Sequence, residues 1–172
     1  SFARDKETKV GAWYLYQGVE EWAWDGMTYT STGNALGNTT MYIQNKREED
    51  YQDDLVYSLY AKLKNHTKDL IHSVEYTASV NIKSTKAGTM IARFNDNDYR
   101  FSLKSGTNTY TFKFEYNNEK GNDVQFFMGL LKDATEVTIT SVKYTSDVSW
   151  TKVPNNNDSF TTGKWRLFAN TT

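Results

Sequence analysis

The sequence contains no cysteine, one proline and two histidines in 172 residues. The absence of cysteine excludes disulfides, zinc-thiolate sites and thiol nucleophiles. His66 and His72 are separated in a way that matches no metal-ligand motif. The chain therefore shows neither a covalent framework nor a metal motif, and its fold must depend on one hydrophobic core.

The chain also lacks an excess of charge of either sign. The chain has 20 Lys and Arg against 21 Asp and Glu, a formal net charge of −1, and no basic stripe. Proteins that bind nucleic acid concentrate positive charge on one surface, so we expect no nucleic-acid partner. The apolar runs are far shorter than the roughly 20 residues of a membrane-spanning helix, so we expect no membrane partner.

Aromatic residues, in contrast, are abundant. The chain has five Trp, twelve Tyr and nine Phe, yet its mean hydropathy is −0.73. Tyr and Trp suit flat, hydrated ligands, above all sugars, because the ring packs against CH groups while its OH or NH stays hydrogen-bonded. The composition therefore favours a carbohydrate ligand.

Apolar and polar residues alternate with period two along almost the whole chain. This alternation predicts about ten strands, at residues 10–16, 20–31, 40–44, 55–63, 73–83, 89–94, 99–103, 109–116, 123–131 and 136–145. Turn residues separate them, for example Asp25-Gly26 and the run Asn95 to Asp98. The pattern predicts an all-β fold, an antiparallel β-sandwich of the jelly-roll type.

One segment, residues 47–64, suits two structures. Its acids come early, its lysines come late, and Leu55, Leu59 and Leu63 have helical spacing. Its apolar residues also alternate, and on that ground we predict an acidic turn followed by a strand. Regular alternation elsewhere predicts that several rings pack in the core or on a sheet face, namely Trp13, Tyr110, Phe112, Phe114 and Tyr116.

Residues 1–150 are predicted to form one domain, because a chain of this length fits a single core. After them, Pro154 opens a polar run at 155–159 that is typical of a linker. The run leads to residues 163–168, which share a Gly-x-Trp-x-Leu-aromatic pattern with residues 11–16. Residues 151–172 are therefore a linker-like run with either an extra strand or the start of a second repeat.

An acidic run offers the best candidates for catalysis. Glu48, Asp50 and Asp53 are close to the Glu-x-Asp-x-x-Glu pattern of laminarinase-like enzymes, and glycosidases need two carboxylates beside the scissile bond. The last position is Asp rather than Glu, no Trp flanks the run, and such charge runs are usually solvated turns. We therefore predict no catalytic residues and keep a small jelly-roll glycoside hydrolase as an alternative.

Four aromatic residues are candidates for sugar contacts. Trp22 and Trp24 point to the same side of a strand, where they form either a sugar platform or part of the core. Tyr51 and Tyr99 stand beside charged turn residues, where we expect a ring to have little core to join.

Residues 41–53, which begin Met41-Tyr42-Ile43-Gln44-Asn45-Lys46-Arg47, resemble a motif of carbohydrate-binding modules. This motif, L-x-V-x-Asn-Arg-Thr-x-x-Trp-x-Gly, belongs to families 4, 9 and 22, and the chain is most similar to the xylan-binding family 22. Residues 74–80 resemble the family's Tyr-x-x-Ser-Val strand, 98–101 a strand with a ligand tyrosine, and 124–129 and 137–144 its last two strands. The resemblance covers residues 10–148 and implies a galactose-binding-like sandwich.

The resemblance puts Tyr51 at the place of the family's stacking Trp and Tyr99 at the place of its cleft Tyr. Lys46 replaces an Arg, and the Gly after the stacking ring is absent. Residues 138–141 also lack the family's Tyr-Ile-Asp-Glu pattern, which carries a calcium ligand and a sugar-binding Glu. The sequence therefore indicates no definite cofactor, and the presence of a structural calcium ion is left open.

The resemblance implies a secreted, non-catalytic module that binds a polysaccharide, β-1,4-xylan or β-glucan, in an aromatic-lined groove. It also implies a monomeric module in a larger extracellular chain with a glycoside hydrolase. The alternatives are the small glycoside hydrolase and a structural or adhesive module of a cell-surface protein. The residues expected to bind the sugar are Tyr51, Tyr99, Trp22, Trp24, Gln44, Arg47, Arg100 and Gln125.

Overall fold

The computed structural model describes residues 6–17, 27–31, 39–45 and 56–147, with only the backbone of Met27–Ser31. Within these residues the chain forms strands and no helix, and thus no helix that could cross a membrane. The strands are β1 (Thr8–Val10), β2 (Trp13–Gln17), β3 (Met27–Ser31), β4 (Thr39–Ile43), β5 (Leu59–Leu63), β6 (Glu75–Ser84), β7 (Gly88–Phe94), β8 (Asn97–Leu103), β9 (Gly106–Glu115), β10 (Val124–Phe127) and β11 (Thr135–Thr145).

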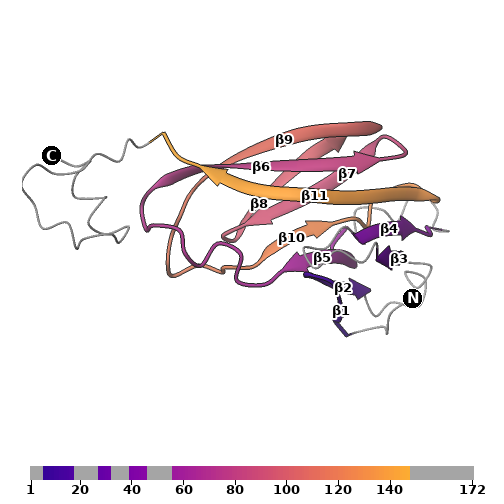
Figure 1. Ribbon diagram of the computed structural model, residues 1–172, viewed down its shortest axis with the longest axis horizontal. Coiled ribbons are helices and arrows are strands. Elements are labelled where there is room, and N and C mark those ends of the chain that lie inside the picture. The colour runs from indigo at the N-terminus through magenta and orange to yellow at the C-terminus, as the bar shows by residue number, and fades with distance from the viewer. Residues whose placement is uncertain (1–5, 18–26, 32–38, 46–55, 148–172) are drawn as a thin grey trace, which may run out of the picture.

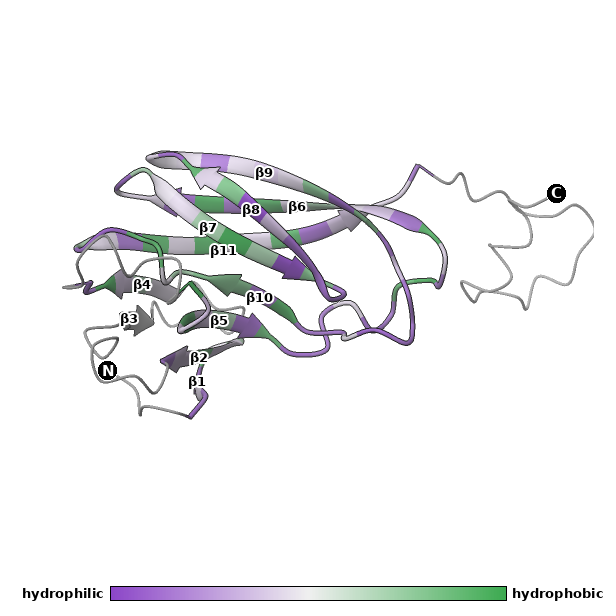
Figure 2. Ribbon diagram, turned by 180° about the vertical axis from the view of Figure 1, so that it is seen from behind, coloured by the Kyte–Doolittle hydropathy of each residue, from purple (hydrophilic) through white to green (hydrophobic). Residues whose placement is uncertain are grey.

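The strands form two sheets. One has six strands in the order β1-β2-β5-β10-β7-β8, and the other has five in the order β3-β4-β11-β6-β9. All neighbouring strands are antiparallel. In Figure 1, β6, β9 and β11 run side by side, and in the reverse view of Figure 2, β7 and β8 of the other sheet cross in front of β6. The predicted antiparallel β-sandwich is confirmed.

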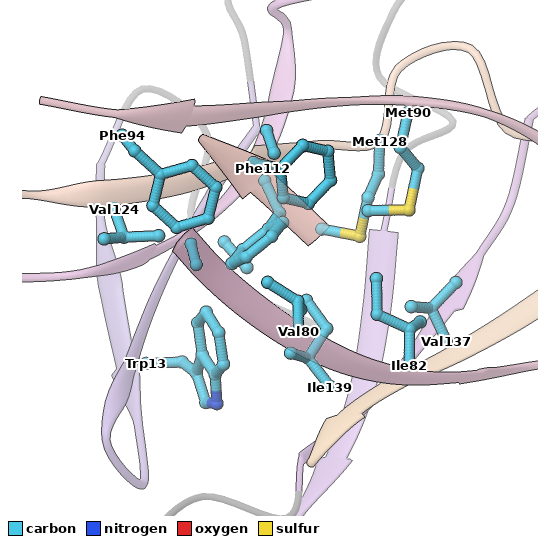
Figure 3. Close-up of a cluster of buried hydrophobic side chains, with 14 of the residues drawn as sticks. Trp13, Val80, Ile82, Met90, Phe94, Phe112, Val124, Met128, Val137 and Ile139 are labelled. Carbon is cyan, nitrogen blue, oxygen red and sulfur yellow. The ribbon is translucent and has the colours of Figure 1, made fainter. Parts of the chain in front are cut away.

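The core lies between the sheets because strands such as β2, β4 and β6 bury alternate residues. In β6, Tyr76, Ala78, Val80, Ile82 and Ser84 are buried, while the residues between them are half-buried or exposed. Figure 2 shows this alternation as hydrophobic and hydrophilic bands along the strands. Figure 3 shows where the two layers meet, with Trp13, Phe94 and Phe112 among the side chains that fill the space.

Several predictions about single segments are confirmed. The strand expected within 47–64 is present as β5, with Leu59 and Ala61 buried. Trp13, Phe112, Phe114 and Tyr116 are buried in the core. Residues 18–26, 46–55 and 148–172 lie outside the described residues, as do the acidic run at 48–53 and the division at residue 150.

The strand expected over 123–131 is too long, since β10 ends at Phe127. The chain turns there, with the Met128 amide donating to the Leu59 carbonyl at 2.9 Å and the Leu131 amide donating to the Met128 carbonyl at 3.1 Å. Met128, Leu130 and Leu131 are nevertheless buried. A buried turn can therefore resemble a strand in sequence, because both are apolar.

Strand β11 contains a bulge between Ile139 and Ser141. Val137 and Ile139 face the core before it, and Val142 and Tyr144 pack against the core after it. Strict alternation would have turned Ser141 and Lys143 inward instead. The extra residue thus keeps both halves of the strand apolar toward the core.

Candidate functional site

The outer surface of the six-stranded sheet carries two rows of side chains that cross the strands. The strand register puts Tyr14, Lys62, Gln125, Arg93 and Asp98 side by side in the first row. It puts Tyr16, Tyr60, Phe127, Ile91 and Arg100 in the second. We call these ten residues the ring face. They face outward because the residues between them, Leu15, Ala61, Phe126 and Ala92, belong to the core.

Aromatic rings form the second row. Tyr16 and Tyr60 stack with ring centroids 4.8 Å apart and planes 14° apart. Phe127 meets Tyr60 edge-on at 5.6 Å and meets Tyr57, from the turn before β5, at 4.8 Å. Phe127 is buried with Val56, Ile91 and Leu130 in a small second cluster, whereas Tyr57 is 47% exposed. The buried cluster supports Tyr57 from below, and the Tyr57 ring remains accessible to solvent.

Charged groups at the β7–β8 end of the ring face hold one another in place. The Arg93 guanidinium donates to both Asp98 oxygens, Nε to Oδ1 at 2.6 Å and Nη2 to Oδ2 at 3.0 Å. It also lies 4.7 Å from the Phe127 ring centroid and donates to Gln125 Oε1 at 3.4 Å. Tyr57 donates its hydroxyl hydrogen to Asp98 Oδ2 at 3.1 Å. A bidentate pair of this kind gives fixed polar groups beside the rings.

The pKa values at this end follow from these contacts. The hydrogen bond from Arg93 lowers the pKa of Asp98, and the same bond raises the pKa of Arg93. Burial, and then the hydrogen bond to Asp98, raises the pKa of Tyr57. At neutral pH the end therefore carries a full ion pair and a neutral phenol.

At the opposite end, Glu7 accepts bonds from several partners. The Tyr60 hydroxyl donates to its Oε2 at 2.8 Å, Lys62 pairs with the same oxygen, and Lys64 lies 3.6 Å from Oε1. Burial opposes ionisation of Glu7, but the bonds from Lys62 and Tyr60 outweigh it and lower its pKa. Burial and the bond to Glu7 raise the pKa of Tyr60. Glu7 is therefore a stable carboxylate next to the rings.

The predicted binding residues lie in different places. Gln125 and Arg100 are on the ring face, in different rows. Gln44 is exposed just after β4 and belongs to the other sheet. Four further residues, Trp22, Trp24, Arg47 and Tyr51, lie outside the described residues. The structure thus places two of the predicted residues on one sheet surface, on strands separated by β7, and a third beside the other sheet.

Tyr99 is on the inner side of β8. It stands opposite Ala92, and its ring packs 5.5 Å from that of Phe112 and 6.4 Å from that of Phe94. Its hydroxyl donates to the Lys113 carbonyl, and burial raises its pKa. The expectation that this ring has little core to join is wrong. Its charged neighbours Asp98 and Arg100 are explained by alternation, since they face outward on the same strand.

Sequence reasoning missed most of the rings on this face. Tyr14, Tyr16, Tyr60 and Phe127 fall in predicted strands, and alternation with buried Leu15, Ala61 and Phe126 was the signal that they face outward. Their proximity depends on strand order and register, which a single sequence does not reveal.

The outer surface of the five-stranded sheet has a different composition. Its outward side chains on β4, β6, β9 and β11, here called the threonine face, include Thr40, Ser79, Asn81, Thr107, Thr109, Thr111, Thr138 and Thr140. They bond to one another across strands, with Thr40 and Thr138 oxygens 2.7 Å apart. Thr140 donates to Asn81 Oδ1 at 2.7 Å, and Asn81 donates to Thr109 at 3.3 Å. Of the described side chains on this face, only Tyr42 is aromatic.

Among the described residues, no three His, Asp or Glu side chains gather in a way that could hold a metal ion. His66 and His72 both have other partners. The His66 Nδ1 lies 2.6 Å from the Tyr144 hydroxyl oxygen, and the His72 Nδ1 accepts the Asn118 amide hydrogen at 3.1 Å.

No protein-family model and no curated protein matches this sequence. Solved structures do match in fold. One is described as "BiXyn10A CBM1 APO", with a TM-score of 0.57 and 16% identity over 76% of this chain and 88% of that one. Another is described as "CBM4 structure and function", with a TM-score of 0.53 and 15% identity over 78% of this chain and 86% of that one.

At this level of identity the comparisons establish the fold. The chain has the jelly-roll β-sandwich fold of carbohydrate-binding modules, in line with its resemblance to families 4, 9 and 22.

Proposed function

We propose that this chain is a non-catalytic carbohydrate-binding module that binds a polysaccharide along the ring face. One observation carries the proposal: on one sheet surface, the ring face and the exposed Tyr57 that packs on it bring stacked and accessible tyrosines beside fixed hydrogen-bonding groups. Five strands separated by about 4.8 Å give a surface roughly 19 Å across from β2 to β8. That length suits an extended chain of sugars better than a single small molecule.

The chemistry of the two rows suits the two sides of a sugar ring. Tyr57, which is 47% exposed, is the ring best placed to pack against CH groups, a contact worth about 0.5 to 1.5 kcal/mol, and the stacked rings of Tyr16 and Tyr60 extend the aromatic surface beside it. Sugar hydroxyls lose water on binding and need replacement partners, which Arg93, Asp98 and Gln125 can provide. A few such contacts predict affinities of roughly micromolar to millimolar.

The finer assignments belong to this proposal. The ligand is β-1,4-xylan or β-glucan, and the module is a monomeric, extracellular part of a larger chain that contains a glycoside hydrolase. Arg100 and Gln125 contact the sugar from the ring face. The remaining predicted binding residues stay predictions, namely Trp22, Trp24, Gln44, Arg47, Tyr51 and Tyr99.

Affinity electrophoresis in gels that contain xylan, mixed-linkage glucan or laminarin tests the proposal. At least one polysaccharide should retard the protein, and Tyr16→Ala should weaken binding about tenfold, which corresponds to the loss of about 1.4 kcal/mol from one contact residue. Tyr42→Ala on the threonine face is the matched control and should bind normally. Migration unaffected by every polysaccharide would favour the structural or adhesive alternative.

The same polysaccharides, incubated with the protein and assayed for new reducing ends, test the enzyme alternative. We expect none. Sustained release of reducing ends that Glu48→Gln abolishes would instead identify a glycoside hydrolase.

A further inference from the structure

Three lysines gather at the corner of the ring face where β1, β2 and β5 meet. The Lys64 ammonium lies 4.1 Å from the centroid of the Tyr14 ring, and the Lys9 ammonium lies 5.8 Å from it. Lys62 stands opposite Tyr14 in the strand register. Lys9 and Lys64 are exposed and Tyr14 is half-buried, so both charges can be reached from solvent beside the ring.

Among the residues that the structure describes at this corner, positive charge is in excess. The ion pairs of Lys62 and Lys64 involve two carboxylates, Glu7 and Asp123, and the distance from the Lys62 ammonium to Asp123 Oδ2 is 3.8 Å. Asp123 has a second role, since its Oδ1 accepts the Asn65 amide hydrogen at 2.8 Å. At the other end of the ring face, by contrast, Arg93 is matched by Asp98. The chain as a whole has a net charge of −1, so this excess is local.

Glu7 shows which group this corner can hold. Its carboxylate is 22% exposed and is bound by two ammonium groups and the Tyr60 hydroxyl. These are donors of the kind that any carboxylate needs when it leaves water. A sugar carboxylate placed above Tyr14 would meet the exposed Lys9 and Lys64 while its pyranose ring contacts the aromatic face.

We propose that the ring face selects an acidic polysaccharide, one whose sugar units carry uronic-acid carboxylates, and that Lys9 and Lys64 bind one such carboxylate above Tyr14. The inference rests on the proposed function, because it specifies the ligand of the same surface. Exposed ion pairs contribute little binding energy each. The lysines therefore give the ring face its preference for acidic over neutral polysaccharides. The rings supply the affinity with which the ring face binds both kinds of polysaccharide.

Isothermal titration calorimetry with matched ligands tests the inference. Glucuronic-acid-substituted xylan fragments are compared with the same fragments after their carboxyl groups have been reduced to alcohols, and a galacturonan is treated in the same way. The acidic form should bind about two- to fivefold more tightly at low ionic strength, as expected for exposed ion pairs. The preference should shrink as salt screens the lysines.

Variants locate the effect. Lys64→Gln should reduce the preference, which is measured for each variant as the ratio of its affinities for the acidic and the reduced fragments, because one of the two ammonium groups that bind the carboxylate is lost. Lys143→Gln is the matched control, since it removes the same charge from the exposed threonine face, and the preference should persist. Glu7→Gln should increase the preference, because Lys62 and Lys64 lose a competing carboxylate.

The outcomes separate this inference from the function on which it rests. Equal affinity for acidic and reduced fragments would overturn the inference and leave the carbohydrate-binding proposal standing. A preference unaffected by Lys64→Gln, or lowered by Glu7→Gln, would overturn the assignment of the corner. If the protein binds neither the acidic nor the reduced form of the xylan fragments and the galacturonan, and also binds none of the neutral polysaccharides, the proposed carbohydrate-binding function is wrong.

Discussion

The ring face and the threonine face are the outer surfaces of two antiparallel sheets that share one core, yet their side chains differ in what they offer a ligand. On the threonine face, hydroxyl and amide groups bond to one another across strands, as in the pairs Thr40–Thr138 and Thr140–Asn81. On the ring face, Tyr16 and Tyr60 stack on each other, and Arg93 pairs with Asp98 on the same surface. Similar backbones therefore support one surface whose side chains bond to one another and one surface that we propose binds sugars.

The comparison also separates stability from binding. Cross-strand pairs on an outer sheet surface stabilise a sheet by roughly 0.2 to 1 kcal/mol each. Rings exposed for a ligand contribute less to folding than buried rings, because part of their surface stays in water. Tyrosines on the inner and outer sides of the six-stranded sheet should therefore respond in opposite ways to substitution.

The largest effect on stability is expected for Tyr99→Ala, which removes a ring packed on Phe94 and Phe112. The free energy of unfolding should fall by about 2 to 3 kcal/mol, as for other large-to-small changes near a core. Tyr57→Ala on the outer side should cost less than about 1 kcal/mol and should weaken glycan binding. Urea denaturation and calorimetry measure the two effects, and a larger stability loss for Tyr57→Ala would contradict the assignment.

A smaller loss is expected for Arg93→Ala. The change leaves Asp98 without its bidentate partner and uncovers the Phe127 ring, which should lower the free energy of unfolding by about 1 to 2 kcal/mol. Lys113→Ala on the exposed side of β9 is the control and should change stability by less than about 0.5 kcal/mol. Urea denaturation measures the free energy of unfolding of both variants. Equal losses in Arg93→Ala and Lys113→Ala would mean that the Arg93–Asp98 ion pair does not stabilise the fold.

The same ion pair predicts a pH dependence. Arg93 lowers the pKa of Asp98 below its ordinary value of 3.8, so the unfolded state binds the proton more readily than the folded state. The stabilisation is therefore complete above about pH 4 and is lost as the pH falls through the lowered pKa. Asp98→Asn should be less stable than the wild type at pH 7, and the gap should narrow on acidification. A gap that stays constant down to pH 2 would disprove this linkage.

The smallest effect is expected on the threonine face. Thr40→Val removes one hydroxyl of the pair with Thr138 and should cost about 0.5 to 1 kcal/mol. Thr111→Val changes an exposed threonine of the same sheet and should be nearly neutral, since valine suits strands. Neither change should alter glycan affinity, and a binding defect in either variant would indicate that the ligand uses this face.

The sequence predicted the strands better than the site, for a physical reason. Alternation shows which residues of a strand share a side, and this was enough to place Phe112 and Phe114 in the core. It does not show which strands are neighbours, and Tyr16, Tyr60 and Phe127 come together only through the pairing of β2, β5 and β10. For Tyr99, the charged neighbours Asp98 and Arg100 suggest exposure in the sequence, although alternation puts them on the opposite side of β8.

The position of β11 in its sheet has a consequence for biosynthesis. It is the last described strand in the chain, yet it lies between β4 and β6, and the bond between Thr40 and Thr138 joins residues 98 positions apart. A ribosome delivers β4 and β6 first, so their facing edges stay unpaired until β11 has emerged. Such non-local pairing slows folding and leaves edges that other chains can bind. A nascent chain that stops before Thr135 cannot complete the five-stranded sheet, and we expect it to depend on chaperones.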